Sequence, residues 1–368
     1  MSISKGIFIV CSNGYGHFRR TLKIAAHLKK AVKSLRLEIF CTPKQTAAHQ
    51  HWPLYMSLMN SRRVKFSAIG NNVNWSNDPG KYTAENLGGW LAHIPSKTIA
   101  DADFVISDNL SSILHIRPNA VLMGSFLWPD ILHTRWRNNE TLRNYHREET
   151  ALLHAVKPPM ICLGPMVMPY IEKHTRPIST GWVIESLNDN IAPRTEITNI
   201  LIAGGGTGFA DENLVTAARL ILKNPKYHLH VSEKLAPHLK AGRERVNTFD
   251  FDAGSFPKID LMVCRPGIGS LTEAVKYHIP VLALNENNNP ELDHNAHRIE
   301  SLGIGKNLNG YISDTLEIIQ QLVDDGTYRS MQNKLTEAPK NGIEETVRFI
   351  ISHFSLRACL EVVLWKRK

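Results

Sequence analysis

The chain has 368 residues, 43% hydrophobic and 21% charged, a composition that excludes an intrinsically disordered protein and leaves room for two domains. Its formal net charge of +9 indicates an anionic partner, such as a nucleotide or an anionic membrane surface. No window approaches the roughly 18 successive apolar residues of a membrane-spanning helix, so we expect none.

The five cysteines are scattered along the chain and form no Cys-x-x-Cys pair. This usage is typical of reduced, buried thiols. No charged-then-apolar leader precedes the first predicted strand. We therefore expect a cytoplasmic protein, in which peripheral contact with the inner membrane face is compatible with the basic charge.

The first half of the chain alternates strands and helices. A glycine turn with Gly14 and Gly16 leads into an amphipathic helix, and a long helix is predicted from about Asp130 to Val156. Residues His49 to Lys97, rich in Trp, Asn and Gly, predict irregular loops. Short apolar runs predict strands at Gly6–Cys11, Leu35–Cys41, Phe104–Ser107, Val121–Gly124 and Met160–Gly164.

The second half restarts the same alternation after a boundary near Pro165–Pro177. We expect domains at residues 1–170 and 178–343, followed by a C-terminal helix at 344–368. Both domains are predicted to be doubly wound, Rossmann-like α/β units. The predicted strands are Ile197–Ala203, His228–Val231, Leu261–Cys264 and Pro280–Leu284, and the predicted helices are Asp211–Leu222, Ser270–Tyr277 and His294–Leu302.

The turn after Leu261–Cys264 is the most informative stretch. Gly267 and Gly269 permit close approach of another group, and Ser270 is placed to cap the following helix. The free N–H groups and positive end of that helix suit a phosphate. Glu273 either closes a capping box with Ser270 or points outward and accepts hydrogen bonds from two neighbouring hydroxyls.

Three motifs resemble the donor-binding half of GT-B glycosyltransferases: C-R-P-G-x-G-S-L-T-E-A, H-I-P-V-L, and E-x-x-x-N-A-x-x-x-E-x-x-G. The closest resemblance is to the group of the lipid II-forming N-acetylglucosaminyltransferase and the antibiotic and steroid UDP-glucosyltransferases. It implies two domains facing across a cleft, with the C-terminal helix packing back on the first domain. It also implies that Glu273 holds the donor ribose and that the Gly267–Ser270 turn faces the diphosphate.

His17 and Asp108 are the candidate catalytic residues. His17 follows the first strand, at the edge where open α/β sheets bind ligands, and an imidazole can take a proton near neutral pH. In the family, the His of this loop acts as a base on the acceptor hydroxyl or contacts donor and acceptor. Asp108 ends a parallel strand and could orient His17 as in a His–Asp dyad, or else cap the next helix.

A second glycine turn, Gly204–Phe209, lies between a strand and a helix and matches neither a P-loop nor a dinucleotide fingerprint. The resemblance places this turn against the donor diphosphate. Arg265 could add a cation there, or pair with Glu273 as a structural contact. The remaining donor-binding residues implied by the family are Gly14, Gly16, Gly205, Gly206, Thr207, Phe251 beside the base, and Glu291 and Asn295 beside the sugar.

We therefore predict an inverting, metal-independent glycosyltransferase that uses a UDP-sugar, or a related pyrimidine nucleotide-sugar, and no cofactor. A nucleotide-sugar hydrolase and a non-catalytic nucleotide-sugar-binding protein are the alternatives. Leu292 replaces a Gln of the relatives' sugar-contacting pair, so the sugar identity does not carry over. The arginines of the long helix favour an anionic or lipid-linked acceptor, and no motif indicates nucleic acid.

Overall fold

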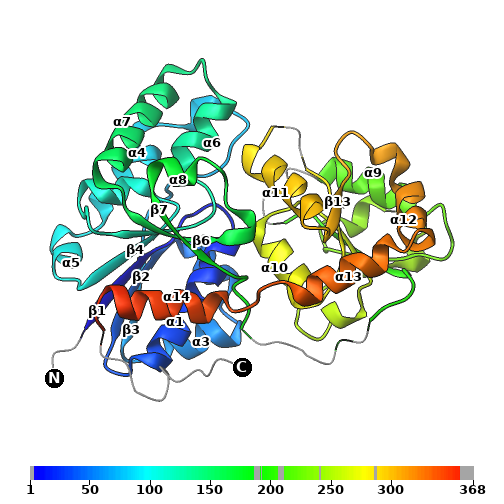
Figure 1. Cartoon of the computed structure of the whole chain (residues 1–368), viewed down its shortest axis with the longest axis horizontal. Coiled ribbons are helices and arrows are strands. Elements are labelled where there is room, and N and C mark those ends of the chain that lie inside the picture. The colour runs from blue at the N-terminus through cyan, green and yellow to red at the C-terminus, as the bar shows by residue number, and fades with distance from the viewer. Residues whose placement is uncertain are drawn as a thin grey trace. The chain divides into compact units, whose positions relative to one another are not determined.

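The chain folds into two α/β units, here called the first and the second unit. The computed structural model describes residues 4–185, 191, 193–205, 211–239, 242–285 and 288–356 (Figure 1). The chain divides after Glu185 and before Asn341, so the first unit contains both ends of the chain and the second unit lies between them. Each unit is built on a parallel β-sheet, which confirms the predicted fold class of two doubly wound α/β domains.

The first unit has a seven-stranded sheet in the order β3-β2-β1-β4-β5-β6-β7, with every neighbouring pair parallel. The inner strands are buried along almost their whole length because helices cover both faces. The strands are β1 (Lys5–Ile9), β2 (Arg36–Cys41), β3 (Val64–Ala68), β4 (Phe104–Asp108), β5 (Val121–Met123), β6 (Pro159–Leu163) and β7 (Arg176–Thr180).

Alternate residues of β1 reach opposite cores of the first unit. Phe8 packs with α1, α3 and α14 on one face, whereas Ile7 and Ile9 pack with α6 and α7 on the other. The helices are α1 (Gly16–Ala31), α2 (Pro43–Ala48), α3 (Pro53–Met59), α4 (Ala84–Leu87), α5 (Ser96–Ala100), α6 (Trp128–Arg135), α7 (Glu140–Val156), α8 (Ile171–His174) and α14 (Gly342–His353).

The second unit has a six-stranded sheet in the order β10-β9-β8-β11-β12-β13, again with parallel neighbours. Its strands are β8 (Asn199–Ala203), β9 (His228–Val231), β10 (Val246–Thr248), β11 (Leu261–Cys264), β12 (Val281–Ala283) and β13 (Gly305–Asn307). Its helices are α9 (Asp211–Ile221), α10 (Ile268–Lys276), α11 (Pro290–Ser301), α12 (Thr315–Asp324) and α13 (Thr327–Glu337).

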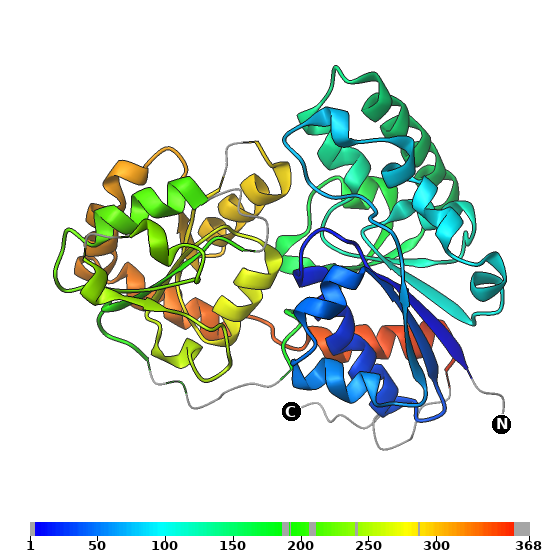
Figure 2. The ribbon, with the colours of Figure 1, turned by 180° about the vertical axis from the view of Figure 1, so that it is seen from behind.

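The C-terminal helix α14 packs against α1 in the first unit, and the two helices lie side by side in both views (Figures 1 and 2). Ile343 and Ile350 are fully buried in this core, and the Phe354 ring stacks on Phe104 at 5.1 Å. Residues 357–368, which complete the predicted C-terminal helix, lie outside the described residues. No helix in the described part of the chain has the length and apolarity to cross a bilayer.

The two points where the chain leaves and re-enters the first unit are joined. Val183 and Asn341 form an antiparallel bridge, and the Gly342 N–H donates to the Trp182 carbonyl at 3.1 Å. A Cβ on Gly342 would lie 2.1 Å from the Gly181 carbonyl oxygen, so the close approach of the two segments requires glycine.

Three predicted elements need correction. The long helix predicted from Asp130 to Val156 is broken, because Asn139 caps the start of α7 by accepting a hydrogen bond from the Leu142 N–H at 3.0 Å. The region predicted to be irregular, His49 to Lys97, contains α3, β3, α4, the start of α5 and the 3-10 helices Pro79–Lys81 and Gly89–His93. The helix predicted from His294 begins earlier, at Pro290, after the capping side chain of Asn289.

The packing of α14 gives a first testable prediction. Replacing Ile350 with alanine should lower the free energy of unfolding of the first unit by about 2–5 kcal/mol, because the side chain is fully buried and its loss leaves a cavity. Chemical denaturation followed by circular dichroism measures the change. Arg348→Ala, at an exposed position of the same helix, is the matched control and should change stability by less than about 0.5 kcal/mol. Equal effects of the two substitutions would contradict the packing of α14.

Candidate functional site

Each sheet has one place where the strand order reverses. In the first unit the chain runs outward from β1 through β2 to β3 and then returns to β4 on the other side of β1; in the second unit the reversal lies between β8 and β11. Open α/β sheets bind ligands at the carboxyl ends of the strands that flank such a reversal. Most of the predicted site residues lie at the end of these four strands or directly after them, so each unit carries candidates at its own switch point. The exceptions are Phe251, which follows β10, and Glu291 and Asn295, which follow β12.

The first unit brings His17 and Asp108 together. His17 Nδ1 lies 2.9 Å from Asp108 Oδ1, and the same oxygen accepts a hydrogen bond from Arg20 Nη2 at 2.6 Å. The Asp108 side chain is 1% exposed, whereas His17 and Arg20 are each 13% exposed. Asp108 therefore makes the contact expected of an orienting carboxylate rather than of a helix cap.

The charge state of Asp108 fixes the proton position on His17. Burial opposes ionisation of Asp108, but the charges of Arg20 and His17 and their hydrogen bonds outweigh it and hold its pKa below the usual range. An ionised carboxylate can only accept hydrogen bonds, and Asp108 Oδ1 lies nearer to His17 Nδ1, at 2.9 Å, than Arg20 Nη2 does, at 3.3 Å, so this contact favours the imidazole proton on Nδ1. The neutral His17 ring then carries its lone pair on Nε2, which is the nitrogen able to take a proton.

The loop before His17 is held by buried polar contacts. Gln45, 1% exposed, donates to the carbonyls of Cys11 and Gly14 at 2.8 and 3.1 Å. The Ser12 N–H donates to Asn72 Oδ1 at 2.7 Å. Gly14 has a φ of +78°, a conformation that favours glycine, and no atom lies within 4 Å of where its Cβ would be. The glycine turn is therefore rigid and open on one side, and Gly16 begins α1 directly after it.

Sequence reasoning missed Arg20 and Gln45. The signal for Arg20 is its position three residues after His17, which places both side chains on one face of α1. Gln45 gives no comparable signal, because it reaches the loop from α2 through a tertiary contact.

In the second unit the two glycine turns lie on neighbouring strands. The Arg265 N–H donates to the Ala203 carbonyl at 3.1 Å, which joins the turn after β11 to the end of β8. No atom lies within 4 Å of a Cβ placed on Gly205 or on Gly267. At Gly205 and at Gly267, another group therefore has room to approach the backbone. Gly206 and Thr207 lie outside the described residues.

The prediction that Ser270 caps α10 is wrong. Gly267 is the N-cap residue and no side chain caps the helix, so Ser270 lies inside the first turn and forms no capping box with Glu273. Gly269 is an exposed residue of this turn, and Glu273 is half-buried one turn further on. An N-terminus without a side-chain cap leaves backbone N–H groups for an anion.

The start of α11 is tied to the same turn. Asn295 is 1% exposed and donates from Nδ2 to the Pro266 carbonyl at 2.9 Å. Asn289 caps α11 by accepting from the N–H groups of Glu291 and Leu292 at 3.1 and 3.3 Å. Glu291 is therefore half-buried in the first helical turn and not in a loop, and Asn295 positions α11 against the turn after β11.

Phe251 is an exposed aromatic residue in a strained backbone conformation. Its φ is +57° and its side chain is 38% exposed. The ring contacts Phe249 edge-on at 4.9 Å, and Phe256 stacks on Tyr277, at the end of α10, at the same distance. This cluster holds a flat apolar ring at the surface. No group of three or more His, Cys, Asp or Glu residues in the described ranges is arranged to hold a metal ion.

Comparison with known proteins identifies the fold. No protein-family model and no curated protein sequence matches the chain. Among solved structures, LpCGTa in complex with UDP matches with a TM-score of 0.69 and 15% identity over 97% of this chain and 100% of that one. The glycotransferase of kitacinnamycin matches with a TM-score of 0.68 and 13% identity over 96% of this chain and 99% of that one. A UDP-glucose:anthocyanidin 3-O-glucosyltransferase in complex with UDP matches with a TM-score of 0.64 and 10% identity over 96% of this chain and 100% of that one. The chain therefore has the GT-B glycosyltransferase fold.

The buried carboxylate gives a second prediction. Asp108→Asn should lower the free energy of unfolding by about 3–5 kcal/mol at neutral pH, because it leaves the Arg20 charge buried without its partner. The pKa of Asp108 is lowered from 3.8 in the folded state, so its stabilisation is complete well above pH 3.8 and is lost as the pH falls below that value. Denaturant titrations over a pH series should show the difference from wild type shrinking in acid.

The control for this series is Asp101→Asn, at an exposed position of the same unit, which should leave stability nearly unchanged at every pH. A deficit in Asp108→Asn that stays constant from neutral to strongly acidic pH would contradict a carboxylate ionised by its neighbours.

Proposed function

We propose that this chain is a glycosyltransferase that moves a sugar from a UDP-sugar, or a related pyrimidine nucleotide-sugar, to an acceptor hydroxyl. The observation that carries the proposal is His17, whose Nδ1 is held 2.9 Å from the buried Asp108 at the first unit's switch point. The GT-B fold supports the reaction class, and two of the three compared structures contain UDP. We assign acceptor binding to the first unit and donor binding to the second.

The proposed chemistry is one displacement. With its Nδ1 proton directed at Asp108, His17 takes the proton of the acceptor hydroxyl at Nε2. The acceptor oxygen bonds to the anomeric carbon as the bond from that carbon to the diphosphate oxygen breaks, so the anomeric centre inverts. The ionised Asp108 stabilises the imidazolium that forms, which is the role of the carboxylate in a His–Asp pair.

The donor is assigned to the switch point between β8 and β11. The N-terminus of α10 and the open glycine turns would hold the diphosphate through backbone N–H groups, and Arg265 would add a cation beside it. These groups supply positive charge for the leaving diphosphate without a metal ion. The further donor assignments in the second unit are Gly205, Gly206, Thr207, Gly267, Gly269 and Ser270 near the phosphates, Glu273 on the ribose, Phe251 beside the base, and Glu291 and Asn295 near the sugar. In the first unit, Gly14 and Gly16 are assigned to the donor on the sequence resemblance alone.

The acceptor side of the proposal is coarser. The net charge of +9 supports an anionic or lipid-linked acceptor and peripheral contact with an anionic membrane surface. The sequence resemblance to the lipid II-forming group supports the lipid-linked acceptor. Delivery of water in place of an acceptor would make the chain a nucleotide-sugar hydrolase, which the first experiment below distinguishes.

The first experiment concerns His17. His17→Ala should lower the rate of acceptor-dependent UDP release by about 10²- to 10⁴-fold, because the general base is lost, while the affinity for UDP stays unchanged. A coupled UDP-release assay with UDP-glucose measures the rate, and isothermal titration measures UDP binding. The control is His27→Ala, on the same helix, which should retain activity. Release of free sugar without acceptor would indicate a hydrolase, and an unaffected rate in His17→Ala would contradict the proposed base.

The second experiment concerns the donor class. UDP at about 100 times its dissociation constant should stabilise the protein by about 2.7 kcal/mol, which shifts the thermal midpoint, whereas GDP and NAD should not. Glu273→Ala should weaken UDP binding about 10- to 100-fold, the range expected for a lost hydrogen bond to a charged group. Glu317→Ala, exposed on α12, is the control and should bind UDP normally. A midpoint that no pyrimidine nucleotide shifts would contradict the donor assignment.

A further inference from the structure

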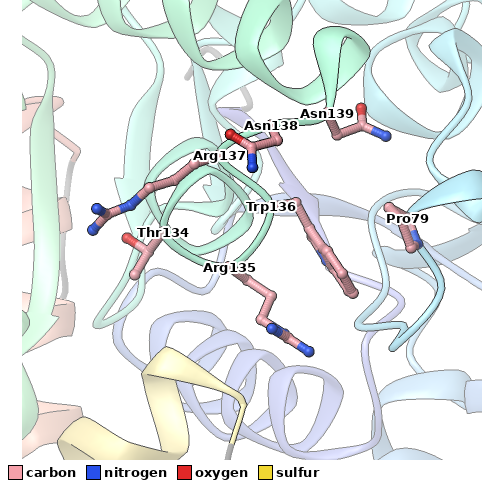
Figure 3. A pocket seen from close by; sticks show the side chains of 7 residues that line it. All are labelled: Pro79, Thr134, Arg135, Trp136, Arg137, Asn138 and Asn139. Atoms are coloured by element: carbon pink, nitrogen blue, oxygen red, sulfur yellow. The ribbon is translucent and has the colours of Figure 1, made fainter.

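The break between α6 and α7 forms a pocket in the first unit. The chain leaves α6 at Arg135 and enters α7 at Glu140, and the intervening backbone folds outward beside the loop that carries Pro79. The pocket has a volume of about 370 Å³ (Figure 3). Its lining residues are Pro79, Thr134, Arg135, Trp136, Arg137, Asn138 and Asn139. This segment is where sequence periodicity predicts uninterrupted helix, so the pocket exists because Asn139 starts a new helix.

The lining is cationic and aromatic. The Arg135 guanidinium lies over the Trp136 ring, with its Cζ 4.3 Å from the ring centroid, and in Figure 3 the ring stands between Arg135 and Pro79. Neither Arg135 nor Arg137 forms a salt bridge within the described part of the chain. Arg135 Nε and Trp136 Nε1 are also buried without a hydrogen-bond acceptor. Two arginines and an indole N–H therefore have donor capacity that these residues do not use.

The nearby acids do not neutralise this charge. Asp130, on α6, lies 3.5 and 3.3 Å from His146 and His174. Asp78, before Pro79, accepts from the Gly80 N–H at 2.9 Å. Glu140 is exposed in the first turn of α7, where it faces the positive end of its own helix.

Both walls of the pocket are connected to the His17 loop. The Phe126 ring contacts His17 at 6.3 Å and Trp128, the first residue of α6, at 5.1 Å. From Trp128, α6 runs seven residues further to Arg135, about 10.5 Å along the helix axis at roughly 1.5 Å per residue. On the opposite wall, the loop leading to Pro79 is fastened to the His17 loop, because the Trp75 N–H donates to Asn13 Oδ1 at 3.2 Å. The pocket and the proposed base thus belong to the same unit and are connected through Phe126 and α6.

We propose that this pocket binds an anionic group of the acceptor, a carboxylate or a phosphate, through Arg135 and Arg137. The proposal rests on the proposed function and narrows it: the acceptor is a molecule that carries a negative charge in addition to the hydroxyl that receives the sugar. An arginine guanidinium can bind two oxygens of either anion at once, and Trp136 offers an apolar face to the adjoining carbon skeleton.

The experiment compares matched probes on two variants. Benzoate, phenyl phosphate and uncharged benzyl alcohol are titrated by ligand-observed NMR against wild type, against the double variant Arg135→Gln/Arg137→Gln, and against Arg147→Gln. Arg147 is exposed on α7 and does not line the pocket. Wild type and Arg147→Gln should bind an anionic probe at least about tenfold more tightly than benzyl alcohol, a difference of about 1.4 kcal/mol. The double variant should lose this preference, and the tighter of the two anions identifies carboxylate or phosphate.

Equal affinity of wild type for charged and uncharged probes would overturn the proposal. A preference that survives in the double variant while UDP occupies the proposed phosphate site of the second unit would also overturn it, provided that the thermal midpoint shows the variant to be folded. UDP titrations on the same samples separate this inference from the proposed function. If wild type binds UDP normally but shows no preference for the anionic probes, only the assignment of the pocket is wrong. If wild type prefers the anionic probes but does not bind UDP, the assignment of the donor site is wrong, and so is the role of the pocket in acceptor binding.

Discussion

The parallel sheets impose the constraint on which the rest of this structure depends. Because parallel strands are joined by right-handed crossovers, a reversal in strand order moves the connecting helices to the opposite face. In the first unit α1 covers one face, and α6 and α7 cover the other, so the loops after β1 and β4 separate at the sheet edge. His17 lies in the first turn of α1, after the β1 loop, and Asp108 is the last residue of β4; the neighbouring strands β1 and β4 bring His17 Nδ1 and Asp108 Oδ1 to 2.9 Å. By the same rule, the reversal between β8 and β11 places the ends of these two strands, with Gly205 after β8 and Gly267 after β11, at the same edge of the second sheet.

The sequence predicts the interior of both sheets and misses their edges. All nine inner strands coincide with short, mainly apolar runs, because helices on both faces bury most of their positions. The four missed strands, β3, β7, β10 and β13, are the four sheet edges. They contain exposed and polar residues, as in Arg176–Thr180 and Gly305–Asn307, and sheet edges commonly carry such residues to avoid pairing with other chains. Their identity as strands follows from the sheet they extend, and no local pattern shows it.

The site divides in a similar way. His17 and Asp108 could be found because each follows a predicted parallel strand, and strand ends are positions that topology brings together. Ser270 was misplaced since a glycine can begin a helix without offering a side chain, so the predicted cap lay three residues too late. The break at Asn139 has a recognisable signal, an Asn followed by Glu140 in the first turn. That signal is weak compared with the helical periodicity on both sides of Asn139. The pocket at the break between α6 and α7 could therefore not be predicted from the sequence.

The bridge between Val183 and Asn341 has a consequence for how this chain can be altered. The chain leaves the first unit and returns to it at two adjacent points, so the second unit is a domain inserted into the first. Such an insertion leaves the hydrophobic core of the receiving domain intact. Here α14, which follows the inserted unit in the sequence, completes the core of the first unit. Evolution or protein engineering can thus exchange the second unit as a whole at the Val183–Asn341 bridge, while the first unit keeps its core residues.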